Sequence, residues 1–236
     1  MLRIRLVLVG IEGKINMGFI VRLAENFGVE DICVISPEFS IDDPEVKEFA
    51  AGGAKALSRV RVEDSLSSCL SGASLSICTT AKTSSEDVLR ISVPSDMVRY
   101  ILPESGAVAL VFGRESVGLT REELSNCDIV STIDTGTEYS TMNLSHAVAI
   151  YLYELARAGS RRLTTGDYCP RNVMDAMYRE ISSFCADLAD ERACIALKRA
   201  LARARLSKSE CGALYKLFKK VWHRLSECSQ IMFADY

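Results

Sequence analysis

Residues 110–120 read Leu110-Val111-Phe112-Gly113-Arg114-Glu115-Ser116-Val117-Gly118-Leu119-Thr120, an apolar run that enters a polar turn bounded by two glycines. Farther along, Met142-Asn143-Leu144-Ser145-His146-Ala147 is a polar turn that opens into an apolar helix. A third turn follows the apolar run Ile4 to Val9 and leads into the segment from Asn16 to Arg22. Turns at the carboxyl ends of parallel strands form ligand sites. The three turns therefore predict one shared site.

The composition is typical of a soluble globular protein. The chain has 236 residues, of which 48% are hydrophobic and 25% are charged, enough for one large domain or for a domain with a small appendage. No apolar stretch approaches the roughly 18 residues of a membrane span, and the apolar run before Gly10 is too short for a signal peptide. We therefore expect a cytoplasmic protein.

The nine cysteines are scattered through the chain without a C-x-x-C pair, and the two histidines, His146 and His223, lie far apart. Zinc sites need several cysteine or histidine ligands at close spacing, so we predict no metal site. In a reducing cytosol we expect these cysteines to remain thiols that pack as small buried hydrophobic side chains.

The net charge of −3 conceals an asymmetry along the chain. Residues 1–156 carry a net charge of −9, whereas residues 157–236 carry +6. Only the C-terminal third therefore favours a polyanionic partner.

Short apolar runs alternate with amphipathic stretches over the first two thirds of the chain. The predicted strands are Ile4–Val9, Asp31–Ile35, Val60–Val62, Leu75–Thr79, Ala107–Phe112 and Ile129–Ile133, and the predicted helices span about 16–27, 44–56, 64–71, 95–102 and 143–158. A capping box of Thr120 and Glu123 predicts a further short helix. Because both faces of the strands are apolar, we expect an α/β domain with a mostly parallel sheet and helices on both faces.

The C-terminal third has a different organisation. Residues 159–170 contain turn formers and no periodicity, which predicts a linker between a domain at 1–158 and a small all-helical, basic extension at 171–236. Helices are expected at 171–189, 190–205 and 208–227, the last opened by a capping box of Ser207 and Glu210. The apolar positions of the last helix, which include Leu217 and Val221, predict a packed face.

Several common catalytic motifs are absent from the sequence. There is no G-x-x-x-x-G-K-[ST] phosphate loop, and Gly10, Gly13 and Gly18 do not have the G-x-G-x-x-G spacing of a dinucleotide site. Arg114 stands two places before Ser116, where the G-x-S-x-G turn of a serine hydrolase has a glycine. The sequence therefore disfavours a serine hydrolase and a nucleotide-dependent oxidoreductase.

In their order and spacing, the three turns resemble the signature motifs of the SPOUT class of RNA methyltransferases, and within that class the TrmJ-like tRNA ribose 2'-O-methyltransferases. The family motifs are N-x-G-x-x-x-R, F-G-x-E-x-x-G-L and S-L-N-x-S/A-x-A. Here they read Asn16 to Arg22, Phe112 to Leu119 and Thr141 to Ala147. The resemblance spans roughly residues 3–157.

This resemblance implies a fold and an activity. It implies a C-terminal trefoil knot in the domain, loops that bind S-adenosyl-L-methionine, and a homodimer in which one subunit's first motif completes the partner's pocket. The implied reaction is methyl transfer to a ribose 2'-hydroxyl of tRNA, at nucleotide 32 of the anticodon loop. Ribosomal RNA is the alternative substrate, and a catalytically silent RNA-binding module is the alternative function. Neither a membrane nor DNA is expected as a partner.

The residues that the resemblance assigns to the methyl donor suit its chemistry. A sulfonium cation beside an adenine requires backbone acceptors, apolar walls and no unpaired cation. The expected pocket residues lie at strand ends and in the turns, and they are Thr79, Gly113, Arg114, Glu115, Gly118, Ile133, Met142 and Leu144.

For catalysis, the resemblance points first to Arg22. A ribose hydroxyl has a pKa far above 7 and a guanidinium stays protonated in proteins, so we favour stabilisation of the developing alkoxide, while a role as base stays open. We expect Glu115 to orient Arg22 or the ribose, and Asn16 and Asn143 to hold their turns by hydrogen bonds. Thr141 replaces the serine of many relatives and keeps its hydroxyl.

The basic residues of the C-terminal extension are the candidates for phosphate contact. Either they bind RNA or they form a solvated helix face, and the excess of positive charge favours RNA. The candidates are Lys198, Arg199, Arg203, Arg205, Lys216, Lys219 and Lys220.

Overall fold

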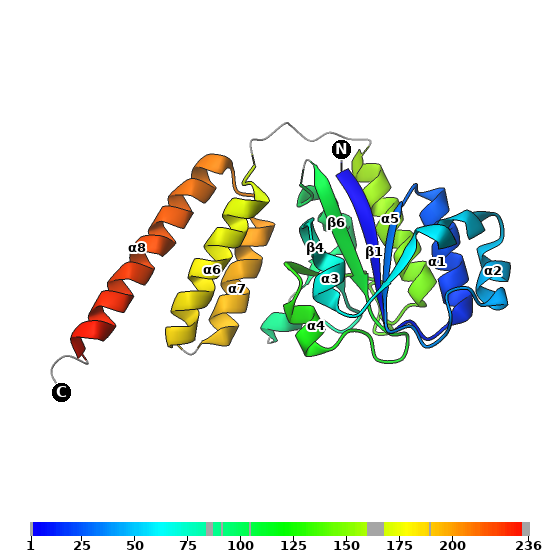
Figure 1. The fold of residues 1–236 in the computed structure, drawn as a ribbon, viewed down its shortest axis with the longest axis horizontal. Coiled ribbons are helices and arrows are strands. Elements are labelled where there is room, and N and C mark those ends of the chain that lie inside the picture. Colours follow the sequence, from blue (N-terminus) through cyan, green and yellow to red (C-terminus); the bar gives the residue numbers. More distant parts are fainter. Residues whose placement is uncertain are drawn as a thin grey trace. The chain divides into compact units, whose positions relative to one another are not determined.

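The computed structural model describes residues 2–83, 87–90, 92–103, 105–159, 168–188 and 190–232 (Figure 1). The chain divides into two compact units, Met1–Leu163 and Thr164–Tyr236, which we call unit 1 and unit 2. Most of the predicted linker, residues 160–167, lies outside the described residues.

Unit 1 is built on a seven-stranded sheet with the strand order β3-β2-β1-β6-β4-β7-β5. Every pair of neighbouring strands runs parallel. The strands are β1 (Leu2–Val9), β2 (Asp31–Ile35), β3 (Val60–Glu63), β4 (Ala73–Thr79), β5 (Val93–Pro94), β6 (Gly106–Phe112) and β7 (Ile129–Thr132). The prediction of an α/β domain is confirmed. Strand β5 was not predicted, because a strand of two residues is too short to form a recognisable apolar run.

Helices cover both faces of this sheet, and Figure 1 shows α3 and α5 on opposite sides of β1. Successive side chains of a strand point to opposite faces. Val111 of β6 belongs to a buried cluster with Leu124 of α4, against which Leu66 of α3 packs. The next residue, Phe112, meets the Tyr151 ring of α5 edge-on at a centroid distance of 5.7 Å.

The helices of unit 1 are α1 (Lys14–Asn26), α2 (Pro44–Ala50), α3 (Leu66–Leu70), α4 (Arg121–Ser125) and α5 (Leu144–Gly159), with 3-10 turns η1 (Ala51–Arg59), η2 (Val88–Arg90) and η3 (Ser95–Tyr100). The single helix predicted for 44–56 is wrong, because the chain breaks at Ala51, whose φ is +47°. Gly53 then lies directly on α1, where a Cβ would come within 2.7 Å of the Arg22 Cα. This glycine therefore permits the close packing of η1 on α1.

Unit 2 consists of three helices, α6 (Arg171–Leu188), α7 (Glu191–Arg203) and α8 (Lys208–Met232). Their buried cluster includes Met177, Ile181 and Leu201. The predicted capping box of α8 is present, since the Glu210 N–H donates to Ser207 Oγ at 3.2 Å and the Ser207 N–H donates to Glu210 Oε2 at 2.8 Å. The predicted packed face of α8 is partly wrong, because Leu217 and Val221 are 52% and 39% exposed.

Eight of the nine cysteines form disulfides, two in each unit. The pairs are Cys33–Cys69, Cys78–Cys127, Cys169–Cys211 and Cys185–Cys194. The expected burial is confirmed for most of these side chains, but the expectation of thiols is wrong. Sequence spacing hides the pairing, because a disulfide depends on the distance between two Cα atoms in the fold.

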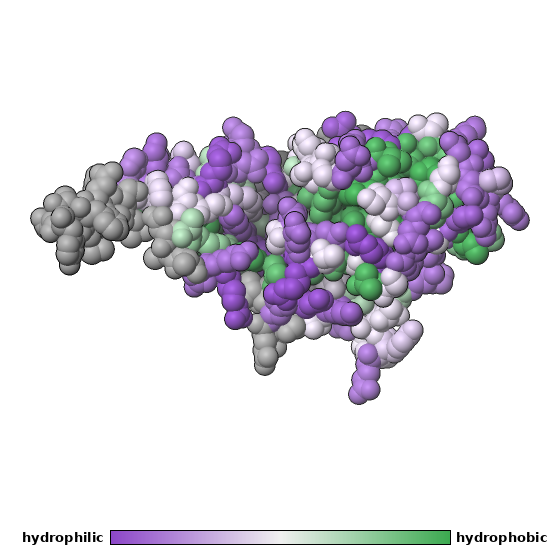
Figure 2. All heavy atoms as spheres, turned by 60° about the horizontal axis from the view of Figure 1, so that its bottom comes forward, coloured by the Kyte–Doolittle hydropathy of each residue, from purple (hydrophilic) through white to green (hydrophobic). Residues whose placement is uncertain are grey.

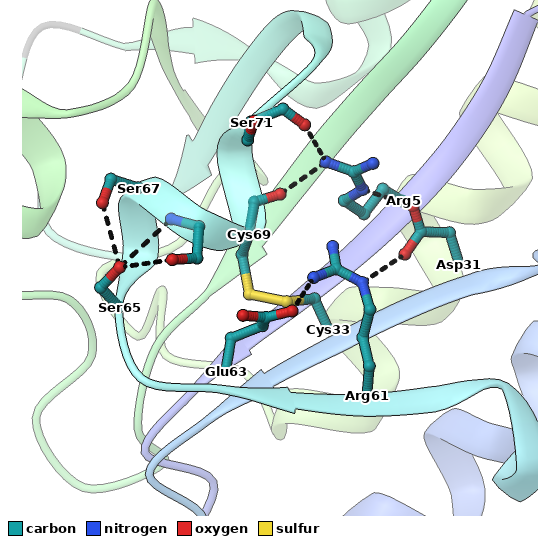
Figure 3. The surroundings of a disulfide bond; sticks show 10 residues. Arg5, Asp31, Cys33, Arg61, Glu63, Ser65, Ser67, Cys69 and Ser71 are labelled. Atoms are coloured by element: carbon teal, nitrogen blue, oxygen red, sulfur yellow. Dashed lines mark hydrogen bonds and ion pairs between the residues drawn. A yellow bond between two sulfur atoms is a disulfide. The ribbon is translucent and has the colours of Figure 1, made fainter.

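The Cys33–Cys69 disulfide ties β2 to α3 beneath a small polar network (Figure 3). The Arg5 guanidinium donates to the carbonyl oxygens of Cys69 and Ser71 at 2.6 and 2.8 Å, and its Nε donates to Asp31. Arginine near a helix C-terminus satisfies carbonyl groups that the helix leaves free. Arg5 therefore fixes the end of α3 from the neighbouring strand.

In the described part of the chain, no helix is both long enough and apolar enough to cross a membrane. On the face drawn in Figure 2, hydrophobic side chains gather over part of unit 1, whereas hydrophilic side chains dominate the described surface of unit 2.

Candidate active site

The site lies where β1 and β6 end side by side. These strands are paired in parallel, with Leu8 opposite Phe112. In the order of the strands, β2 and β3 lie next to β1 toward one edge of the sheet. Strands β4, β7 and β5 lie beyond β6 toward the opposite edge. Such a switch in strand order opens a crevice at the carboxyl ends of the strands. The turns after β1 and β6, which we call the first corner (residues 10–16) and the second corner (residues 113–119), meet here.

Glu115 of the second corner binds the first corner. Its carboxylate accepts hydrogen bonds from the backbone N–H groups of Glu12 at 2.9 Å and Gly13 at 3.1 Å. It also accepts one from Asn16 Nδ2 at 2.8 Å. Backbone N–H groups at the start of a helix lack intrahelical partners. The Glu115 carboxylate therefore accepts hydrogen bonds from backbone N–H groups that α1 leaves without partners.

Asn16 joins the first corner to the turn before α5, which we call the third corner (residues 141–145). Its Oδ1 accepts a hydrogen bond from Asn143 Nδ2 at 3.0 Å. The Asn143 Oδ1 in turn accepts from the Ser145 N–H at 2.9 Å and from Ser145 Oγ at 2.7 Å, so Asn143 caps α5. The three corners predicted to share one site are thus linked through Glu115, Asn16 and Asn143.

The second corner is a closed turn. Arg114 and Gly118 exchange backbone hydrogen bonds of 3.3 and 2.9 Å, and Gly118 has a φ of +74° that favours glycine. The Arg114 guanidinium donates to both carboxylate oxygens of Glu123 at 3.1 to 3.2 Å. Glu123 is also the capping partner of Thr120, as predicted. Arg114 therefore pairs with an acidic residue of α4.

These contacts also set the ionisation of Glu123. Its partial burial acts to raise its pKa, but the Arg114 guanidinium and the Thr120 N–H outweigh that effect. The net result is a pKa below the ordinary value of 4.5. Glu123 is therefore ionised at neutral pH and neutralises Arg114.

Glycines make the contact between the corners possible. A Cβ on Gly13 would lie 3.0 Å from Glu115 Oε1. One on Gly10, whose φ is +62°, would lie 2.7 Å from Arg114 Nε. Side chains at these two positions would separate the first and second corners. A Cβ on Gly113 would lie 2.3 Å from the Gly118 carbonyl carbon and would open the second corner itself.

The remaining candidates for donor binding lie at this same edge. Thr79 ends β4 and donates from its hydroxyl to the Val111 carbonyl of β6 at 3.0 Å. Ile133 and Met142 are half-buried, and Leu144 is buried at the start of α5. Apolar side chains at a strand edge, with Arg114 already neutralised, fit a ligand that carries a positive sulfonium.

Arg22 has no partner side chain in its own subunit among the described residues. It lies on α1, exposed, and no hydrogen bond or ion pair of its guanidinium is found among the described residues. Within one subunit the Glu115 carboxylate binds the first corner and not Arg22, so the expectation that Glu115 orients Arg22 or the ribose stays a prediction. Thr141 is also exposed, and no hydrogen bond of its hydroxyl is found in the described region.

The basic candidates of unit 2 fall into two groups. Lys216, Lys219 and Lys220 are exposed on α8, and Arg203 is half-buried on α7. The prediction fails for Arg199, which is only 3% exposed and cannot present its charge to a phosphate.

Two further basic candidates have protein partners. The Arg205 guanidinium lies 4.2 Å from the centre of the Tyr168 ring. Lys198 Nζ donates to Ser182 Oγ at 2.6 Å, and its burial lowers the pKa of the amine. These contacts leave the exposed lysines of α8 as the stronger candidates for phosphate contact.

Sequence reasoning missed Glu12 and Glu123 as members of the site. The Glu12 carboxylate accepts from the Ser116 N–H at 3.0 Å and from Ser116 Oγ at 2.5 Å. Glu123 could have been found from its capping-box position, three residues after Thr120. No sequence pattern marks Glu12, because its partner is 104 positions away. Within the described residues, no cluster of three or more metal-binding side chains occurs.

Comparisons with known proteins match the chain to a methyltransferase family. The model of the SpoU rRNA Methylase family matches residues 3–153. The tRNA (cytidine-2'-O-)-methyltransferase TrmJ of Sulfolobus acidocaldarius is 33% identical over 228 residues, which cover 95% of this chain and 95% of that protein.

Two solved structures have a similar fold. TrmJ from Z. mobilis ZM4 has a TM-score of 0.66 at 18% identity, over 92% of this chain and 98% of that one. An AdoMet-bound rRNA methyltransferase from Sinorhizobium meliloti has a TM-score of 0.54 at 20% identity, over 69% of this chain and 57% of that one. At these identities the likeness concerns the fold.

Proposed function

Because the chain belongs to the SpoU rRNA methylase family, we propose that it transfers the methyl group of S-adenosyl-L-methionine to a ribose 2'-hydroxyl of tRNA. The observation that carries the proposal is the hydrogen-bonded chain from Glu115 through Asn16 to Asn143, which joins all three corners. The full-length similarity to a tRNA (cytidine-2'-O-)-methyltransferase supports the substrate class.

Different residues of the three corners have different proposed roles in binding the donor and in positioning it. When bound, S-adenosyl-L-methionine supplies an electrophilic methyl group on a sulfonium. Gly113, Gly118 and Leu144 offer main-chain groups and an apolar wall for it, with Thr79, Ile133 and Met142 beside them. Arg114, paired with Glu123, adds no free positive charge that would repel the sulfonium. Glu115, Asn16 and Asn143 keep the three corners at fixed distances, so that the methyl carbon and the attacking ribose oxygen can be aligned.

Arg22 is the proposed catalytic residue, and it acts on the partner subunit's site. With the donor bound, the ribose oxygen would accept the methyl group, the donor would leave as a neutral thioether, and the hydroxyl proton would pass to solvent or to a base. A permanently charged guanidinium stabilises the negative charge that develops on the oxygen. Its exposure on α1, with no hydrogen bond to Glu115, supports a role outside its own subunit.

A homodimer through α1 and α5 is part of this proposal. Ile15 and Phe19 of α1 are 43% and 38% exposed, and Tyr153 of α5 is 53% exposed. The two helices pack against each other, so these side chains favour a protein contact on one face. The trefoil knot implied by the sequence resemblance belongs to the same proposal, as does action in the cytoplasm, where tRNA is modified.

Nucleotide 32 of the anticodon loop is the proposed target, with ribosomal RNA as the alternative that the family's name suggests. Transcripts of one tRNA can be prepared with a single 2'-deoxyribose at nucleotide 32 or at nucleotide 34 and incubated with labelled donor. We expect the first substitution to abolish methyl incorporation and the second to leave it unchanged. Incorporation that persists without the hydroxyl of nucleotide 32 would contradict the target, and labelling of ribosomal RNA alone would favour the alternative.

The exposed lysines of α8 are proposed to contact tRNA phosphates. Replacing Lys216, Lys219 and Lys220 by alanine should weaken tRNA binding and flatten its dependence on salt, by about 0.7 in the logarithmic slope for each lost contact to single-stranded RNA. Titrations at several salt concentrations measure this slope. Lys47→Ala, which removes an exposed lysine of unit 1, is the control, and an unchanged slope in the triple variant would exclude these contacts.

A further inference from the structure

We infer that Glu12 is a positioning residue for the proposed reaction, because it clamps the second corner through Ser116 and thereby fixes the turn that binds the methyl donor. The inference rests on the proposed function. It adds a residue that lies outside the three sequence motifs, since Glu12 precedes the first motif at Asn16.

The clamp and the Glu115 contact are reciprocal. Glu115 reaches from the second corner to the backbone N–H of Glu12, and Glu12 reaches back to the backbone N–H of Ser116. The Glu12 carboxylate also accepts the Ser116 hydroxyl at 2.5 Å. Each carboxylate therefore binds the main chain of the opposite corner. Hydrogen bonds from N–H and O–H groups to a carboxylate are stronger than neutral ones.

The exposed residues of the second corner, Ser116 and Val117, have few other contacts that would fix them. Arg114 is fixed by Glu123, and Glu115 is fixed by the first corner. Beyond them, Ser116 is exposed and Val117 is 63% exposed, so packing contributes little to the order of this part. The two hydrogen bonds from Ser116 to Glu12 therefore order this part of the turn in place of buried contacts. Loss of the clamp would leave Gly118, at the end of the turn, less well placed for the donor.

Loss of the clamp should weaken donor binding more than it slows turnover. In Glu12→Ala, the dissociation constant for S-adenosyl-L-methionine should rise about tenfold, as expected for the loss of one or two charge-assisted hydrogen bonds. The turnover rate at saturating donor should fall by a smaller factor than the affinity, because bound donor helps to order the second corner and because Glu115 and Asn16 still join the corners. Glu12→Gln keeps one side-chain oxygen as acceptor and should recover part of the lost affinity.

Calorimetric titration of the protein with S-adenosyl-L-methionine, together with steady-state kinetics and melting temperatures, tests the inference. Glu38→Ala is the matched control, since Glu38 is an exposed glutamate that contacts the first corner only through its backbone N–H, which donates to the Ile11 carbonyl. Ser116→Ala should reproduce part of the effect of Glu12→Ala. In the double variant the two losses should be less than additive.

Three results would overturn the inference. Donor affinity in Glu12→Ala equal to that in Glu38→Ala would show that the clamp does not matter. A parallel loss of affinity, turnover and melting temperature, without recovery in Glu12→Gln, would show that Glu12 only supports the fold. If the wild-type protein itself does not bind the donor, the proposed function fails and this inference fails with it, an outcome distinct from the first two.

Discussion

Glu115 accepts a 2.8 Å hydrogen bond from the side chain of Asn16, although the two residues are 99 positions apart in the sequence. The same carboxylate accepts hydrogen bonds from two backbone N–H groups at the start of α1. The Asn16 side chain also accepts a hydrogen bond from Asn143. The Glu115 carboxylate therefore takes part in joining three turns that are remote in sequence. The integrity of the site can be tested at this residue.

Glu115→Ala should destabilise unit 1. The substitution leaves the N–H groups of Glu12 and Gly13 without their acceptor, and a partly buried donor without a partner costs about 1–3 kcal/mol. Urea unfolding at neutral pH measures the loss in the free energy of unfolding. Glu122→Ala, which removes an exposed glutamate of α4, should change this free energy by only a few tenths of a kcal/mol. Equal stability of the two variants would contradict the structural role of Glu115.

Arg22→Ala should abolish methyl transfer while changing donor affinity by no more than a few-fold, because Arg22 does not contact the corners of its own subunit. Mixed dimers test the proposed action on the partner. If inactive Arg22→Ala and Asn143→Ala proteins exchange subunits at random, roughly a quarter of wild-type activity should return, since half of the dimers have one complete site. Absence of any recovery would mean that Arg22 acts within its own subunit.

Much of unit 1 could be predicted because its strands are buried on both faces. Such strands are continuous apolar runs, and six of the seven were found from that pattern. The turns could be predicted for a related reason, since their glycines and polar residues interrupt those runs. The meeting of the three turns also followed from the rule that parallel strands end at the same edge of the sheet.

What could not be predicted depends on contacts between distant residues. The role of Glu115 and the membership of Glu12 arise from hydrogen bonds across about one hundred positions, for which a single sequence has no pattern. The same holds for the four disulfides. Burial of Arg199 was missed because a basic residue at helical spacing is usually exposed.

The ion pair of Arg114 with Glu123 should make the protein sensitive to acid. Because the pKa of Glu123 is lowered in the folded state, its stabilising effect is fully present above the unfolded-state pKa, near 4.5, and is lost as the pH falls through the folded-state pKa. Glu123→Gln should therefore be less stable than the wild type at neutral pH, with a difference that shrinks below a pH of about 4.5. Urea unfolding at several pH values measures this difference. A difference independent of pH would contradict the assignment.

The disulfides predict the number of reactive thiols. Alkylation of the unfolded, unreduced protein should modify one cysteine, Cys228, whereas alkylation after reduction should modify all nine. Mass spectrometry distinguishes these states. Reduction should also lower the melting temperature, because each disulfide that closes a long loop contributes about 2–4 kcal/mol. Nine modified cysteines without reductant would show that the pairs do not form.

Mapping of methylated nucleosides tests the central claim most directly. Transcripts of tRNA and ribosomal RNA that carry no ribose methylation would be incubated with the protein and S-adenosyl-L-methionine. The RNA would then be digested into fragments for mass spectrometry. The account predicts one new 2'-O-methylated ribose in tRNA, at nucleotide 32. A protein that binds the donor but methylates only ribosomal RNA would contradict the substrate. RNA that gains no methyl group would contradict the claim that the three corners form a methyltransferase site.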